Sequence, residues 1–218
     1  MNTQKTKALK TFTFNDISLF EKRYRAQMIN CISGIKSMNL IGTQGQDGQK
    51  NLAIFSSVIH MGSNPPLIGF IQRPTTVDRH TYENIISTSY YTINAVTEDL
   101  SMKAHQTSAR YEKNENEFEE TSIEHEYLNG FLAPFVKNTP MKIGLKLEDI
   151  IPIEANNTKL IIGKVEQLHI NEDYIEEDGR IRIEDTTIVG GAGLDTYLRT
   201  EKHGRYSYAK PDETLKNL

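Results

Sequence analysis

Two long β-type segments constrain the fold of this sequence more than any other feature. They occupy residues 141–154 (MKIGLKLEDIIPIE) and 159–170 (KLIIGKVEQLHI), and only the turn-forming ANNT separates them. Four earlier segments have the apolar and β-branched composition of strands: 28–42, 52–62, 66–72 and 90–97. Strands at hairpin-like spacing that do not alternate with helices predict a mostly antiparallel β-barrel rather than a doubly wound sheet.

A helix is expected where the third strand ends. The helical spacing of Tyr82, Ile85 and Ile86 predicts it. It would start near Asp78, because Thr75 and Asp78 have the separation of a capping box. Asp78 itself is the alternative N-cap.

The other connections are also visible in the sequence. The polar, glycine-rich stretch 43–51 predicts a hairpin loop, and Pro65 and Pro66 end the strand that precedes 66–72. A second helix is predicted over 98–111, with three residues facing inward: Leu100, Met102 and Ala104.

No linker or internal repeat divides the chain, so we expect one domain over residues 1–218. Residues 1 to about 14 would form an N-terminal tail. Residues from about 173 to 218 have little periodicity and are expected to wrap the surface or a neighbouring subunit.

Composition excludes some classes of partner. The net charge of −4 gives no positive field to attract nucleic acid. The sequence has neither a signal peptide nor an apolar run of about 18 residues, so we expect a cytoplasmic protein that does not contact membranes. Its single cysteine, Cys31, is expected to pack in the core of a strand.

Hydrogen-bond donors are concentrated where the segment 66–72 leads into the first predicted helix. Free N–H groups at a helix start favour an anion, and arginines and hydroxyls would complete a phosphate pocket. The donors are Arg73, Thr75, Thr76, Arg79 and Thr81. A capped helix with solvated arginines is an equally good interpretation of these residues.

Two serines stand within an apolar segment. Ser56 and Ser57 follow the apolar start of NLAIFSSV (51–58), and buried hydroxyls need hydrogen-bond partners. A flat, heteroatom-rich ligand could provide these partners. Neighbouring backbone could also do so.

These features occur in an ordered set that resembles the flavin reductase family. The set is NLAIFSSVIHMGSNPPLIGFIQRPTTVDRHTYENI followed by YYTINAV, and the resemblance extends from about Met28 to Ile170. It implies a fold that is mostly β with inserted helices, the split β-barrel that binds flavin mononucleotide (FMN).

The resemblance also implies which residues bind the cofactor. A polar residue, here Asn51, precedes the strand that runs along the isoalloxazine ring, and an arginine and hydroxyl cluster holds the ribityl phosphate. The strand positions are Ala53, Ile54, Phe55, Ser56 and Ser57, and the phosphate positions are Arg73, Arg79, His80 and Thr81.

For function, the resemblance implies an oxidoreductase that transfers electrons from NADH or NADPH through non-covalently bound FMN to an acceptor. The protein's part would be placement, so no catalytic acid, base or metal is expected. The family also implies a homodimer with each flavin near the interface. The alternatives are an FMN-containing electron carrier that acts with a redox protein partner, and a non-redox barrel that binds another phosphorylated ligand.

One departure from the family pattern affects turnover. Many reductases of the family carry Gly-Asp-His before the strand ending in IG.V, and its histidine lies near the nicotinamide side of the flavin. Asn156, Asn157 and Thr158 stand there in this sequence, which disfavours turnover of a freely diffusing nicotinamide donor. The segment 198–210 could substitute as a lid, or it could be a solvated tail.

Overall fold

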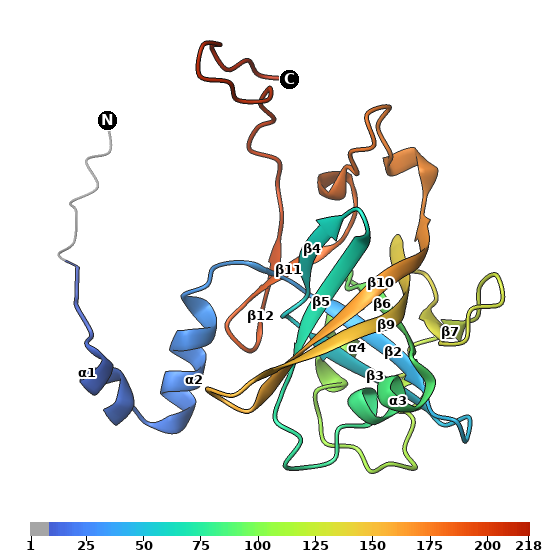
Figure 1. Ribbon diagram of the computed structural model, residues 1–218. Helices are drawn as coiled ribbons and strands as arrows, with labels where there is room; N and C mark the ends of the chain where they lie inside the picture. The colour runs from blue at the N-terminus through green and yellow to red at the C-terminus, as the bar shows by residue number, and fades with distance from the viewer. Residues whose placement is uncertain (1–8) are drawn as a thin grey trace.

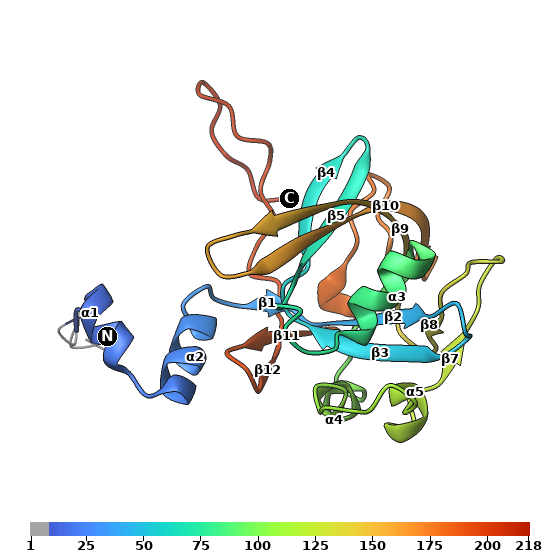
Figure 2. The same ribbon diagram turned by 60° about the horizontal axis from the view of Figure 1, so that its bottom comes forward.

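A seven-stranded antiparallel sheet that curls into a barrel is the centre of the computed structural model, which describes residues 9–218 (Figure 1 and Figure 2). Its strands have the spatial order β3-β2-β6-β9-β10-β5-β4. They are β2 (Asn39–Gln44), β3 (Lys50–Phe55), β4 (Ile59–Ser63), β5 (Pro66–Gln72), β6 (Tyr90–Ala95), β9 (Met141–Ile153) and β10 (Thr158–Ile170). The predicted antiparallel barrel and the hairpin loop between β2 and β3 are confirmed.

The pair β9 and β10 connects the two halves of this sheet. Each strand has 13 residues, and β10 pairs with β9 on one side and with β5 on the other. The β9–β10 register shifts twice, between Ile162 and Gly163 and between Val165 and Gln167. Such irregularities increase the local twist, which helps a sheet to curl.

Ser57 connects the chain that follows β3 to β5 across the curled sheet. Its hydroxyl accepts a hydrogen bond from the Ile71 N–H (3.1 Å) and donates one to the Ile71 carbonyl (3.3 Å). β3 ends at Phe55, two residues before Ser57. The bonds to β5 here therefore come from a side chain and not from backbone pairing between strands. The Ser57 hydroxyl is therefore paired with protein backbone, which was one of the two partners expected from the sequence; the other was a ligand.

Apolar side chains cover both faces of the sheet. On β2, Leu40 and Ile41 point to opposite faces, and both are fully buried. The Ile41 side packs with Ile85 of α3 (His80–Thr88). The Leu40 side packs with Ala104 of α4 (Ser101–Gln106) and Phe118 of α5 (Glu117–Glu120).

Two small sheets complete the barrel. One has the order β1-β11-β12, and the other contains β7 and β8. These strands are β1 (Lys36–Ser37), β7 (His125–Glu126), β8 (Phe135–Val136), β11 (Val189–Ala192) and β12 (Thr196–Arg199). Short 3₁₀ turns occur at Glu172–Tyr174 and Ile183–Asp185.

Both ends of the described chain extend away from the barrel (Figure 1). The N-terminal arm consists of α1 (Phe14–Leu19) and α2 (Lys22–Cys31), and neither helix has a buried residue. At the other end, the chain after β12 leaves the body as a long extension. None of the helices within residues 9–218 has the length and apolar character needed to cross a membrane.

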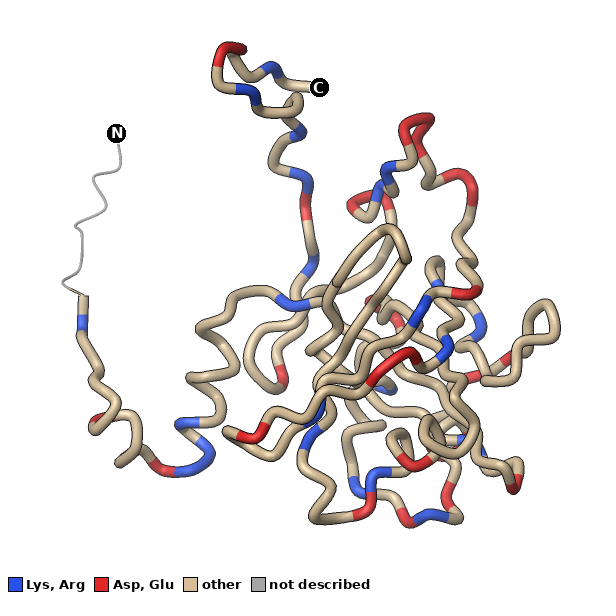
Figure 3. The backbone as a smooth tube through the Cα atoms, viewed as in Figure 1, with Lys and Arg blue, Asp and Glu red and all other residues tan. Residues whose placement is uncertain are grey.

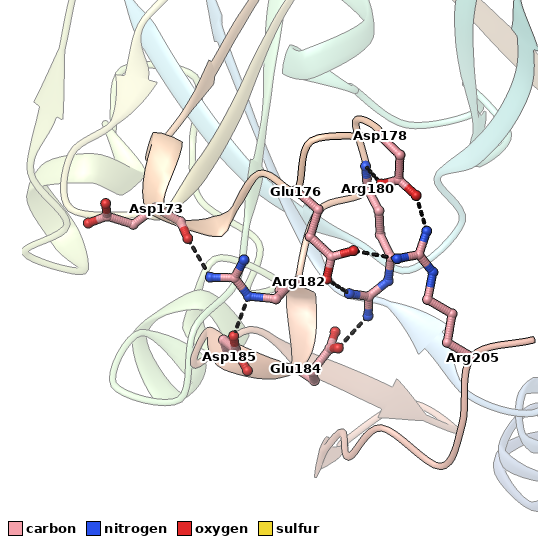
Figure 4. Close-up of polar contacts among 8 residues, drawn as sticks. All are labelled: Asp173, Glu176, Asp178, Arg180, Arg182, Glu184, Asp185 and Arg205. Atoms are coloured by element: carbon pink, nitrogen blue, oxygen red, sulfur yellow. Dashed lines mark hydrogen bonds and ion pairs between the residues drawn. The ribbon is translucent and has the colours of Figure 1, made fainter. Parts of the chain in front are cut away.

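An ionic cluster fixes the point where the C-terminal extension passes the barrel (Figure 4). Glu176 accepts hydrogen bonds from Arg180 (2.6 Å) and Arg205 (2.5 Å), and Arg205 also pairs with Asp178. Figure 3 shows acidic residues in the segment that follows β10 and basic residues along the extension. Because ion pairs of this kind contribute little individually, the cluster sets position more than stability.

Part of the first predicted strand is helical. Residues 28–31 belong to α2, and Cys31 is exposed and not in a strand core. The helix forms because the Glu21 carboxylate accepts hydrogen bonds from the free N–H groups of Arg23 and Tyr24 at its start. The expected N-terminal tail, residues 1 to about 14, ends where α1 begins at Phe14; the part of that tail before residue 9 lies outside the described residues.

The segment 52–62 forms two strands and not one. After β3 the chain crosses to β4, which lies at the opposite edge of the sheet. Ser56 and Ser57 are therefore in the crossing and not in the middle of a strand. The apolar composition is continuous across the break because the chain stays partly buried there.

The two predicted helices exist with different ends. α3 has Arg79 as its N-cap without a side-chain cap, and the Glu83 carboxylate accepts a hydrogen bond from the Arg79 N–H (3.0 Å) instead. The predicted capping box is therefore wrong. α4 is shorter than 98–111, and Met102, expected to face inward, is 85% exposed.

Candidate functional site

A cavity of about 500 Å³ lies where β3, the end of β5 and the start of α3 meet. All ten residues predicted to contact a cofactor line it: Asn51, Ala53, Ile54, Phe55, Ser56, Ser57, Arg73, Arg79, His80 and Thr81. They come from segments separated by up to about thirty residues, so only the fold brings them together. Of the further donors considered, Thr75 and Thr76 are not part of the cavity wall that the described residues form.

One side of the cavity is a strand wall. Residues 53–57 of β3 and the crossing after it form this wall, which is half-buried in the protein. Because β3 is an edge strand, its outer backbone groups are not used by another strand. The wall therefore offers an apolar surface together with backbone donors and acceptors, which suits a flat heteroaromatic ring.

The other end of the cavity is rich in donors. Arg73, Arg79 and His80 line it where α3 begins, and the first N–H groups of this nine-residue helix have no partner within the helix. The Arg79 Nε donates to the Pro74 carbonyl (3.2 Å), which holds the guanidinium against the loop. The positive end of the helix dipole and these cations favour an anionic group here.

A buried polar network supports the wall and the helix start. The Glu117 carboxylate of α5 accepts a hydrogen bond from the Leu52 N–H (2.9 Å) on the outer edge of β3. The Asn51 amide satisfies its neighbours when its oxygen accepts from the Thr81 hydroxyl (2.9 Å) and its nitrogen donates to Glu117 Oε1 (3.2 Å). Asn51, Thr81 and Glu117 are each about 5% exposed, so this network links three elements away from bulk water.

Burial raises the pKa of Glu117 above its ordinary value of 4.5. The hydrogen bond from Leu52 opposes this shift, because it stabilises the ionised carboxylate. The desolvation effect is the larger of the two. Glu117 is therefore easier to protonate than an ordinary glutamate. The other charged side chains in the cavity wall are three arginines, Arg73, Arg79 and Arg110, and one carboxylate, Asp78.

Sequence reasoning missed the far wall of the cavity. This wall comes from α4 and the loop after it and from the β11–β12 hairpin, and it includes His105, Arg110, Tyr111, Leu194 and Tyr197. The His105 Nδ1 lies 3.2 Å from the Tyr197 hydroxyl, which connects the two segments. The donor-rich sequence HQTSARY was the available signal, but it lay inside a predicted helix.

Two predicted features are not part of this cavity. The β9–β10 turn that contains Asn156 and Asn157 does not contribute to the described cavity wall, and neither does the proposed lid segment 198–210.

The stretch GGAGLDT (190–196) forms the β11–β12 hairpin turn, and its Gly193 and Leu194 line the cavity. Within residues 9–218, no three His, Cys, Asp or Glu side chains lie together as metal ligands would.

Comparisons with known proteins agree with this architecture. The family model described as the flavin reductase like domain matches residues 35–182. A crystal structure of a candidate flavin reductase with a split barrel domain from Shewanella frigidimarina NCIMB 400 is 45% identical in sequence, with a TM-score of 0.88. That similarity covers 92% of this chain and 100% of the Shewanella chain.

More distant structures share the fold. Nitrilotriacetate monooxygenase component B from Bacillus cereus is 20% identical, with a TM-score of 0.80 over 92% of this chain and 100% of that chain. The 2-nitrobenzoate 2-nitroreductase of Pseudomonas fluorescens is also 20% identical, with a TM-score of 0.78 over 94% of this chain and 99% of that chain. The predicted split-barrel fold is thereby confirmed.

The pH dependence of stability tests the role of Glu117. Because its pKa is raised in the folded protein, Glu117 contributes most below about pH 4.5, and this contribution is lost as the pH rises through the folded-state pKa. We expect the free energy of unfolding of the wild type, relative to Glu117→Gln, to fall as the pH rises above 4.5. Urea unfolding at several pH values measures this difference.

The matched control is Glu120→Gln, which changes an exposed carboxylate of the same helix. Its stability should follow that of the wild type across the pH range. Parallel curves for the wild type and Glu117→Gln would show that the buried carboxylate is not raised in pKa.

Proposed function

The chain belongs to the flavin reductase like domain family, and we propose that it is an FMN-binding oxidoreductase that passes electrons from NADH or NADPH through flavin to an acceptor. One observation carries the proposal. The strand wall, expected to face a flavin ring, and the cationic helix start, expected to hold a phosphate, line the same cavity. A cavity with an apolar wall and one cationic end fits a planar ligand that bears a terminal phosphate.

The donor set of the cavity fits FMN in its chemistry. Arg73 and Arg79 can make charge-assisted hydrogen bonds to phosphate oxygens, and the N-terminal N–H groups of α3 add neutral donors. Residues 53–57 would lie along the ring, with backbone groups for its polar edge. The Asn51–Thr81–Glu117 network would hold these two parts of the site at a fixed separation.

Bound FMN would supply the redox chemistry, as an acceptor of hydride and a donor of electrons. The chain would bind and orient the ring along β3 and neutralise the phosphate at the start of α3. His105 and Tyr197 stand on the opposite wall and would limit access of water and substrate to that part of the cavity. This division of work requires no nucleophile or metal.

A second candidate function is an electron carrier that exchanges electrons with a redox protein. The β9–β10 turn, which has Asn156 and Asn157 in place of the family's histidine motif, favours this candidate. No histidine from that turn could meet a nicotinamide donor. The two functions differ in whether NADH or NADPH reduces the flavin directly.

The N-terminal arm supports the further proposal of a homodimer. Phe14, Leu19 and Ile32 are 83%, 84% and 73% exposed, and α1 and α2 contain no fully buried residue. Large apolar side chains exposed together on an extended arm favour contact with another surface. The second copy of the chain is the partner that the family resemblance implies.

Absorbance spectroscopy tests the redox proposal. After incubation with FMN and desalting, we expect the protein to retain flavin absorbance, and we expect anaerobic NADH or NADPH to bleach it. Retained absorbance that neither nucleotide bleaches would favour the electron carrier. Failure to retain FMN, together with no NAD(P)H-dependent reduction of added FMN, would contradict both functions and favour a barrel for another phosphorylated ligand.

Arg79→Ala tests the anionic end of the site. We expect it to weaken FMN binding by about 1–3 kcal/mol, because charge-assisted hydrogen bonds to the phosphate are lost. Titration calorimetry with FMN and riboflavin measures the effect, and riboflavin, which has no phosphate, should bind both proteins equally. The exposed Lys137→Ala is the control for loss of a positive charge elsewhere. An unchanged FMN affinity would remove Arg79 from the site.

Leu19→Glu tests the arm as a dimer contact. We expect the wild type to sediment as a dimer and Leu19→Glu to shift toward monomer, because a buried charge opposes an apolar interface. Met102→Glu, a similarly exposed apolar residue outside the arm, should leave the dimer intact. A monomeric wild type at micromolar concentration would contradict the proposal.

A further inference from the structure

Five consecutive residues after α4 line the cavity and belong to its far wall. They are Thr107, Ser108, Ala109, Arg110 and Tyr111, named here the TSARY loop. Ser108 and Arg110 are exposed in the ligand-free structure, so a molecule in the cavity can reach their side chains. The roles proposed for the strand wall and for the cationic end of the cavity leave this loop without a function.

Several donors of the TSARY loop have no partner among the described residues. The Thr107 hydroxyl donates to the Ala104 carbonyl (2.8 Å), and the Tyr111 hydroxyl accepts from Gln106 (3.1 Å). By contrast, the Ser108 hydroxyl, the Arg110 guanidinium and the backbone N–H groups of residues 110 and 111 bond to no atom of residues 9–218. A cation together with hydroxyl and backbone donors is the set that binds an oxyanion.

The arginines of the cavity differ from most arginines elsewhere in the described chain. Three guanidinium groups make no hydrogen bond or ion pair within residues 9–218, those of Arg23, Arg73 and Arg110, and two of these three residues line the cavity. The other arginines bond to carboxylates or to backbone carbonyls. Cations without partners on two walls of one cavity indicate an anionic ligand.

An ion pair places the TSARY loop beside the start of α3. Lys113 Nζ, two residues after the loop, lies 4.0 Å from Glu83 Oε2. The other carboxylate oxygen of Glu83 accepts a hydrogen bond from the N–H of Arg79, the N-cap of α3 (3.0 Å). Because three residues of chain span at most about 10 Å, Arg110 cannot lie far from this ion pair. The loop and the cationic end of the cavity are therefore neighbours.

We infer that the TSARY loop is the second half of an oxyanion site, in which Arg110 and Ser108 bind the terminal phosphate of FMN from the side opposite Arg79 and the start of α3. The inference rests on the proposed function, since it assumes FMN in the cavity. A phosphate monoester carries nearly two negative charges at neutral pH, so it can pair with more than one arginine. The phosphates of NADH or NADPH have the same chemistry, and the test distinguishes them from the phosphate of FMN.

The test compares FMN with riboflavin on the full chain. We expect Arg110→Ala to weaken FMN binding by about 10- to 100-fold, because a charge-assisted hydrogen bond is lost, and Ser108→Ala to weaken it by about 5-fold. Riboflavin has no phosphate, so its affinity should not change in either variant. Arg110→Lys should lie between Arg110→Ala and the wild type, since it keeps the charge and loses the paired donors. Fluorescence titration gives the dissociation constants.

A matched control separates this role from a general effect of charge. Arg23→Ala removes another exposed arginine whose guanidinium has no partner in the described chain, at a position that does not line the cavity. It should change neither affinity. The melting temperatures of the ligand-free Arg110 and Ser108 variants should equal that of the wild type, because both residues are exposed and unpaired.

Four results would contradict the inference. Unchanged FMN affinity in Arg110→Ala would overturn it and leave the proposed function intact. Unchanged FMN affinity with a raised KM for NADH or NADPH would assign the loop to the nicotinamide nucleotide and also overturn it. An equal loss of affinity for FMN and riboflavin would assign Arg110 to another part of the flavin. A wild type that binds neither flavin would overturn the proposed function, and the inference with it.

Discussion

The pairing of β10 with both β9 and β5 is the constraint on which the rest of the structure depends. It curls the sheet so that β5 returns to β3, although these strands are separated by four others in the sheet order. Gly163 permits this arrangement, because a Cβ there would lie 2.0 Å from the Tyr91 hydroxyl inside the barrel. Tyr91 is fully buried, and burial raises the pKa of its phenol, so its ring fills the interior in the neutral form. Without this return of β5, the strand wall and the cationic end would not share a cavity.

The sequence predicted those parts of the fold in which local pattern and tertiary environment agree. The segments that became β5, β6, β9 and β10 have strand composition and lie in the sheet with nearly the predicted ends. The prediction failed at 28–31, where the helix that begins after the Glu21 cap continues into an apolar stretch. It also failed at 56–58, where the chain crosses from one sheet edge to the other without a change in composition. Such a crossing depends on which strand is the partner, and that information is not local.

Part of the candidate site could also be predicted from the sequence, and part of it could not. Residues 51–57 and 73–81 could be predicted because each segment carries its own chemistry, and the fold brings both to one cavity. Sequence reasoning misses Glu117, Arg110 and Tyr197. Glu117 comes from a segment typical of a solvated surface, Arg110 from a predicted helix, and Tyr197 from a part of the chain with little periodicity. The segment 111–126 is acidic, which is typical of a solvated surface, yet Glu117 is buried against the backbone of β3. Its partner is an edge-strand N–H, and only the three-dimensional arrangement reveals that this donor needs an acceptor.

The β11–β12 turn contacts both the cavity and the N-terminal arm. Gln27 of α2 donates to Asp195 (3.0 Å) and accepts from the Leu194 N–H (3.2 Å), and Leu194 also lines the cavity. Asn30, one turn further along α2, lines it as well. Gly193 fits against α2 because it has φ +63° and no side chain, and a Cβ there would lie 2.8 Å from the Cys31 sulfur. The arm that is exposed enough to meet a second copy is therefore held by residues that also shape the ligand cavity. If the arm contacts a second copy, as proposed, the β11–β12 turn would connect that interface to the far wall of the cavity.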